Sequence, residues 1–317
     1  MKPSVGFLIT SELVEAIKRR AFIPSAQNTL IDEDIIRFLN EEMKDNIVPM
    51  LKASKEDYLI YSTYIPFVAN KNKYEVPYRA VGGIVRDLKQ EDPQGNLSGM
   101  TKIQPEDRHF FQGSSENRFS TFYFEGDSIV MFPGVGSNPT GGLRILFYMR
   151  PNDLVDEDRV GQIIDIDRTL GIITLDNLPS HIVAGTTIDF LQWKPGHRII
   201  NYDLNVVSTN PTNKQVIVAL ADISDDLVNN DILAASGECI IPQLPPELHT
   251  LLVEKVVAQC MKAQGDLEGY SVSMADLNKK EEKAATLIKN RSEGNVEKVN
   301  NMNSPLRSSK IGRRRFM

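Results

Sequence analysis

The apolar positions near the start of the chain recur at helical spacing. Over residues 10–20 they fall three and four positions apart, with acidic residues early and basic residues late, which an amphipathic helix and its macrodipole favour. Pro24 is predicted to end this helix. A second helix is predicted from near Thr29, whose hydroxyl can cap it, through Ile47, with a kink or an end at Pro49. Together they form an antiparallel hairpin, and further helices are needed to cover its apolar faces.

Those further helices are predicted near the other end of the chain. Residues 245–247 (Pro-Pro-Glu) predict a helix start. The apolar residues that follow, as far as Cys260, lie around much of the helix, which indicates burial on more than one side. Gly265 marks a break, and a more polar helix is predicted over about residues 267–289. Because the terminal helices complete each other, the middle of the chain is predicted to be an insertion.

The middle of the chain, roughly residues 58–241, has the pattern of short β-strands. Runs of β-branched or aromatic residues alternate with turn residues. Residues 123–133 predict a hairpin with its turn at residues 125–127, and a second group of strands begins near Val160. Their even spacing favours one or two small barrels or sandwiches over a parallel sheet. The expected fold class is therefore α+β: a helical bundle formed from both chain termini with an inserted antiparallel β region.

This pattern predicts a division of the chain into five segments. Residues 153–158 are the predicted linker between the two β domains. The segments are the first part of the helical domain (1–57), a β domain (58–153), a second, small barrel-like β domain (154–243), the second part of the helical domain (244–292) and a basic C-terminal tail (293–317).

Composition adds that the chain is an ordinary globular one. At 317 residues, 41% hydrophobic and 25% charged, it has enough material for one or two cores. The apolar run near the start is interrupted at Thr10, so no secretory signal is expected, and no stretch reaches the ~18 apolar residues of a membrane span. Cys239 and Cys260 lie far apart and are predicted to be free thiols.

The distribution of charge is uneven. The net charge is −6, yet the last eleven residues carry +5, so the rest of the chain carries −11. This asymmetry favours a tail with its own partner, although a terminus that merely keeps the chain soluble fits equally well. The predicted partner-interface residues are Arg307, Lys310, Arg313, Arg314, Arg315 and Phe316.

The titratable residues do not form a recognisable catalytic or metal-binding motif. Asp165 and Asp167 alternate along a predicted strand and share one face, where they could hold a cation or act as paired carboxylates, but a solvated face is the commoner explanation. The four histidines lack metal-ligand spacing, and a lone histidine next to two phenylalanines is more often packed than ligating. They are His109, His181, His197 and His249.

The glycine-rich stretch at residues 134–142 superficially resembles a phosphate-binding loop. It lacks the Lys-Ser/Thr ending and leads into a predicted strand instead of a helix, so a hairpin loop explains it better. The chain also lacks the Gly-x-Ser-x-Gly motif of a nucleophile elbow. We therefore expect neither an enzyme nor a bound metal or cofactor.

Nucleic-acid binding is a further possibility, because the basic tail and several aromatic residues could contact a backbone and stack bases. The acidic remainder argues against a folded binding face, so any DNA contact would be made by the tail.

Several stretches resemble a family of phage head-to-tail adaptor proteins found in short-tailed phages, including crAss-like ones. None is diagnostic alone, and the resemblance rests on their order and on the shared plan of helices, β insertion and helices. The stretches are residues 17–24, 29–36, 74–83, 123–133, 179–190 and 241–249.

The resemblance implies a structural virion protein at the head–tail junction, assembled in the host cytoplasm. It implies a homo-oligomeric ring of 12 copies below the portal protein, with the helical domain against the portal, the β domains facing other ring or tail proteins, and DNA passing through the centre. In related adaptors a C-terminal segment reaches the portal, which would give residues 302–317 a partner, although they lie outside the matching stretches. The family has no catalytic residues to carry over.

Two other classes of function remain open. One is a tail or baseplate subunit that binds glycans, but the only tryptophan, Trp193, precedes the predicted turn at residues 194–197. The other is a hydrolase that uses Asp165, Asp167 and Asp189 as its acids.

Overall fold

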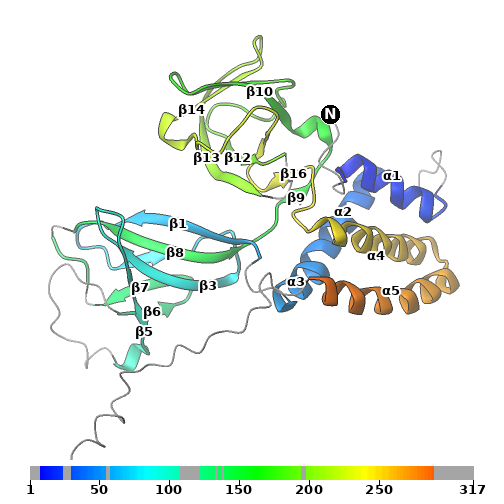
Figure 1. Ribbon diagram of the computed structural model, residues 1–317, viewed down its shortest axis with the longest axis horizontal. Coiled ribbons are helices and arrows are strands. Elements are labelled where there is room, and N and C mark those ends of the chain that lie inside the picture. Colours follow the sequence, from blue (N-terminus) through cyan, green and yellow to red (C-terminus); the bar gives the residue numbers. More distant parts are fainter. Residues whose placement is uncertain are drawn as a thin grey trace, which may run out of the picture.

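The computed structural model describes residues 8–23, 30–54, 58–107, 121–132, 134–137, 139–193 and 198–288. Helices gather on one side, and two β modules lie beside them (Figure 1). The protein is therefore a mixed α and β protein with many antiparallel strands, as predicted. No helix within these ranges is long and apolar enough to cross a membrane.

The helix α1 (Thr10–Arg20) spans the predicted residues, and a left-handed turn closes it. The Ile23 N–H donates to the Lys18 carbonyl at 3.0 Å, and Phe22 between them has a φ of 52°. This is the left-handed closure that usually has glycine at that position. The helix thus ends before Pro24, which lies outside the described residues together with Thr29.

The second helix continues past its predicted limit. α2 (Asp32–Glu42) has Ile31 as its N-cap, and it runs through a π-helical turn, η1 (Met43–Ile47), into α3 (Val48–Ser54). Pro49 has no N–H to donate to the preceding turn, and its ring crowds that turn. The wider π turn directly before Pro49 leaves room for the ring and does not need the missing hydrogen bond, so the helix does not end there.

The helices near the far end pack against those near the start. α4 (Pro246–Gln264) contacts α1 and α2, and α5 (Leu267–Leu287) packs against α4. Polar contacts reinforce this packing: Glu254 of α4 accepts from Arg20 of α1, and Gln259 donates to Glu42 of α2. Gly265, with a φ of 84°, turns the chain between α4 and α5.

The first β module consists of two four-stranded sheets whose apolar residues belong to one core. All strand pairs are antiparallel except β5–β6. One sheet has the order β1 (Ile60–Pro66), β8 (Gly142–Met149), β3 (Ala80–Glu91), β4 (Leu97–Gly99). The other has the order β2 (Lys73–Glu75), β7 (Ser128–Phe132), β6 (Thr121–Glu125), β5 (Thr101–Lys102).

The predicted hairpin at residues 123–133 is present as β6 and β7, joined at a turn where Gly126 has a φ of 59°. The described part of the glycine-rich stretch, residues 134–137 and 139–141, connects β7 in one sheet to β8 in the other. It is therefore not the predicted hairpin loop. Gly141 lies so close to β3 that a Cβ atom there would be 2.1 Å from the Glu91 carbonyl oxygen. Close backbone approach, and not ligand binding, accounts for this glycine.

The second β module is a closed six-stranded barrel with its own core. Around the barrel the strands are β10 (Gly161–Asp167), β11 (Ile172–Leu175), β14 (Gln215–Val218), β13 (Ile199–Asn210), β12 (Thr187–Leu191) and β15 (Ile232–Ala235). Short 3-10 helices, η3 (Glu157–Arg159) and η4 (Leu220–Asp222), adjoin it. The predicted small barrel is confirmed.

The chain enters and leaves the barrel at one place. β9 (Asp153–Leu154) before the barrel pairs in parallel with β16 (Glu238–Cys239) after it. Asn40 of α2 exchanges hydrogen bonds with the Leu154 backbone, donating at 3.0 Å and accepting at 2.7 Å. The barrel is thus inserted at a neck that is attached to the helices.

Candidate functional site

A buried polar cluster lies where the two β modules and the neck meet. We call it the junction cluster. Arg79 stands at the end of the first module next to β3, and its side chain is 5% exposed. Asp189, on β12 of the barrel, is completely buried. The remaining members are Asn152, Asp203, Ser236 and Gln243.

Asp189 is the acceptor at the centre of the junction cluster. The Arg79 Nη1 lies 3.0 and 2.9 Å from its two oxygens. The Asn152 Nδ2 donates at 2.8 Å, and the backbone N–H groups of Asp203 and Gly237 each donate at 3.0 Å. A buried carboxylate is stable only when it is paired and hydrogen-bonded in this way.

Arg79 is held equally firmly. Burial disfavours its charged form, but the attraction of Asp189 and Asp203 outweighs this, so the pKa of Arg79 is raised above its ordinary value. Its Nη2 also donates to the Asn152 side chain. Asp203, in a left-handed conformation with a φ of 56°, accepts from Arg79 at 3.3 Å and from the exposed Tyr78 hydroxyl at 2.6 Å. The guanidinium is therefore a fixed charge with defined partners.

The junction cluster also reaches the helices. The Asn152 N–H donates to the Gln243 side chain at 2.8 Å, and Gln243 directly precedes the segment that leads into α4. The Tyr58 hydroxyl, at the start of the first β module, donates to the Gln243 carbonyl at 2.8 Å. One connected network therefore joins the first module, the barrel, the neck and the approach to α4. Its arrangement is that of a structural ion pair that fixes how the modules are oriented.

Aromatic contacts extend this junction. The Tyr202 ring of β13 packs edge-on against Tyr61 of β1 and Phe147 of β8, with ring centroids 6.3 and 6.4 Å apart. The Tyr61 hydroxyl accepts from the Ile199 N–H at 2.9 Å. The barrel thus rests on the first module through an apolar contact next to the polar one.

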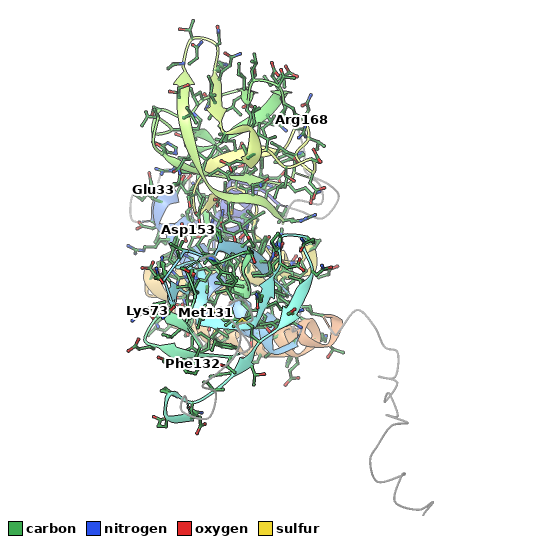
Figure 2. All side chains as sticks on the ribbon, turned by 90° about the vertical axis from the view of Figure 1, so that its left-hand side faces the viewer. Glu33, Lys73, Met131, Phe132, Asp153 and Arg168 are labelled. Carbon is green, nitrogen blue, oxygen red and sulfur yellow. The ribbon has the colours of Figure 1, made fainter. Side chains whose placement is uncertain are left out.

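An outward-facing pocket of about 380 Å³ lies along α2 and η1, and we call it the α2 pocket. Its charged lining residues are Glu33, Arg37, Glu41, Lys44, Asp45 and Asp153. Figure 2 shows Glu33 and Asp153 close together in projection. Four acids and two bases give the lining an excess of negative charge.

The structure places the predicted acids in separate roles. Asp165 is exposed on β10, whereas Asp167 accepts from the backbone and hydroxyl of Thr169. The Thr169 hydroxyl, the Thr169 N–H and the Leu170 N–H lower the pKa of Asp167. Asp189 is bound to Arg79 as described above. These contacts do not bring the three carboxylates together as a catalytic set.

The predicted histidine and cysteine positions give no metal centre within the described ranges. His249 is buried, its Nδ1 accepts from the Leu8 N–H at 3.2 Å, and its Nε2 lies 3.2 Å from the Leu244 carbonyl. His181 is 3.7 Å from Glu238. His109 and His197 lie outside the described residues. Cys239 and Cys260 are buried free thiols, as predicted.

Trp193 and the basic tail complete the comparison with the predictions. The Trp193 side chain is buried, and its backbone N–H donates to Asp231 at 2.9 Å, so the indole offers no exposed platform for a sugar. The turn predicted at residues 194–197 lies outside the described residues. So do the predicted tail residues Arg307, Lys310, Arg313, Arg314, Arg315 and Phe316.

Sequence reasoning did not identify the Arg79–Asp189 pair. The two residues are 110 positions apart, and neither belongs to a local motif. Both fall in stretches, residues 74–83 and 179–190, on which the predicted resemblance to a known family rests. No family model matches this chain, and no curated protein matches it.

Proposed function

We propose that this protein is a non-enzymatic ring subunit of a tailed-phage virion that joins the portal vertex of the head to the tail. The proposal starts from the resemblance to head-to-tail adaptors of short-tailed phages. It takes from that family a ring of 12 copies, below a portal protein and above other ring or tail proteins, with DNA passing through the centre.

The observation that carries the proposal is the buried network around Arg79 and Asp189. A subunit that joins two different structures must keep its two contact regions in a fixed relation. The junction cluster supports this, because it ties both β modules to the neck and to the approach to α4. We infer that helices from both ends of the chain form one bundle that faces the portal.

The distribution of charge fits the proposed DNA channel. The chain apart from its last eleven residues carries −11, and a lumen that is acidic on balance repels phosphate groups and does not hold DNA. The basic tail is then available for a protein partner, and in this proposal the partner is the portal.

Native mass spectrometry of the full chain, alone and mixed with its cognate portal, tests the proposal. We expect a defined complex with the portal and a subunit count that matches a closed ring. A variant with Arg313, Arg314 and Arg315 replaced by serine should bind the portal more weakly. Replacing the exposed Lys71 and Lys102 of the first β module, which faces away from the portal in this proposal, should leave binding unchanged. A chain that stays monomeric with portal present would contradict the proposal.

A further inference from the structure

The α2 pocket contains carboxylates that lack ion-pair partners among the described residues. Lys44 pairs with Asp153, and Arg37 lies 3.7 Å from Glu41. These pairs use both cations that line the pocket. Glu33 and Asp45, both exposed, are left without a cation. An outward helix face with unpaired charge at both ends is suited to bind a positively charged segment.

Neighbouring acids strengthen this charge. Burial together with the negative charges of Asp158, Glu33 and Asp32 raises the pKa of Asp156, which lies in the linker beside the N-terminal end of α2. This repulsion reflects several negative charges lying close together at that end of α2. A bound cationic segment would relieve it.

The α2 pocket also has an apolar part. Ile36 lines it and is 8% exposed, between the charged residues that precede and follow it on α2. A segment that fits the pocket would therefore combine several cations with apolar side chains, and would be long enough to follow the helix. The chain itself contains such a segment: residues 305–317 include five cations together with Leu306, Ile311 and Phe316, and no acid.

We propose that the α2 pocket binds the basic C-terminal segment, residues 305–317, of the same chain. This inference does not depend on the ring function, because it concerns a contact within one chain. In an assembling virion the pocket would hold the segment until a partner displaced it.

The length of the chain permits this contact. α5 packs against α3, and Figure 1 shows the C-terminal end of α5 next to α3, the helix that directly continues η1. Residues 289–306 can span up to about 60 Å when extended. A tether of this kind gives its end an effective concentration in the millimolar range, which favours binding in the same chain over binding between chains.

The spacing of charges also agrees. Glu33 and Asp45 are twelve positions apart on a continuous helical stretch, which corresponds to about 18 Å. In an extended polyproline II segment, which has three residues per turn, Arg307, Lys310 and Arg313 share one side, and Arg307 and Arg313 lie about 19 Å apart. An extended segment could therefore place one cation near each unpaired carboxylate.

Carbodiimide cross-linking of the full chain tests the contact, because this reagent joins an amine to a carboxylate only when the two groups touch. Lys310 is the only lysine between residues 305 and 317. We expect links from Lys310 to Glu33, Asp45 or other acids of the α2 pocket. They should disappear at ~1 M salt, where the Debye length is about 3 Å.

Variants with matched controls identify the binding surface. Glu33→Gln combined with Asp45→Asn should lower the yield of links from Lys310 to the remaining pocket acids about tenfold, as expected from the loss of two partly exposed ion pairs. Glu75→Gln combined with Asp127→Asn, which changes exposed acids of the first β module, should leave it unchanged. Because all four positions are exposed, the variants should keep the far-ultraviolet circular dichroism of the parent.

Mixing ¹⁴N- and ¹⁵N-labelled chains distinguishes the possible occupants. Links confined to chains of one label support the proposal. Links between labels would overturn it in favour of a second copy, and links from Lys310 to acids elsewhere, or none at all, would overturn it outright. Portal binding can fail while these intrachain links persist, so the two proposals fail independently.

Discussion

The Arg79–Asp189 pair allows a quantitative prediction of stability. In Asp189→Asn the side chain keeps its shape but loses its charge, and its amide nitrogen cannot accept from the donors that surround the native carboxylate. Arg79, 5% exposed, would retain only Asp203 at 3.3 Å as its ion-pair partner. Breaking a buried pair by removing one partner costs about 3–5 kcal/mol, a large part of the ~5–15 kcal/mol that stabilises a typical domain.

Urea unfolding followed by tryptophan fluorescence measures this loss. Trp193 is the only tryptophan, its side chain is buried, and its backbone N–H donates to Asp231 at 2.9 Å. The midpoint of Asp189→Asn should fall sharply. Asp225→Asn is the matched control, because its exposed carboxylate lies 3.8 Å from Arg168, and such a pair contributes about 0–1 kcal/mol.

A double variant separates the effect of the ion pair on the free energy of unfolding from its effect on how the two β modules are oriented. Arg79→Met combined with Asp189→Leu removes both charges and should recover much of the lost stability. It also removes the hydrogen bonds to Asn152 and Gly237, so small-angle X-ray scattering should show a wider range of module orientations than in the parent. A loss below about 1 kcal/mol in Asp189→Asn would refute the structural role of the ion pair.

Three further predictions concern single positions. Phe22→Gly should raise the free energy of unfolding by about 1 kcal/mol in urea titrations, because Phe22 has a φ of 52° and is 87% exposed; a decrease would show that the ring contributes to packing. Gly141→Ala should lower the free energy of unfolding by about 2 kcal/mol or more, because the new Cβ would collide with the Glu91 carbonyl. Gly95→Ala has the same left-handed strain without a collision and should lower it less; equal losses in the two variants would contradict this reasoning. Burial raises the pKa of Cys260 to about 11, so at pH 8 this thiol should react with a disulfide reagent only after unfolding, and fast reaction of the native chain would contradict its burial.

The helices and several strands could be predicted from periodicity, because local spacing reports which side of an element is buried. The hairpin at residues 123–133 and the helix that starts at Pro246 are examples. The bounds of α1 were predicted correctly, but its left-handed closure was not, because phenylalanine is an unusual residue in that conformation. At Pro49 either a kink or an end was predicted. The helix does not end there, because a π turn removes the clash that would otherwise end it.

The junction cluster could not be predicted, for a different reason. Arg79, Asn152, Asp189 and Gln243 lie on four separate segments, and each looks like an ordinary surface residue in its local sequence. Only the closing of the barrel and the pairing of β9 with β16 bring them together. Long-range polar networks of this kind leave no local pattern. For the basic tail, the sequence shows the charge directly. It does not show the binding surface, because that surface is formed by residues far away in the sequence.

The most direct test of the central claim is native mass spectrometry of the full-length chain with its cognate portal. The proposal predicts a complex in which the copies of this chain form a closed ring on the portal. Binding should weaken when the arginines at 313–315 are replaced and stay unchanged when Lys71 and Lys102 of the first β module are replaced. A chain that remains monomeric and unbound at micromolar concentrations of portal would contradict it.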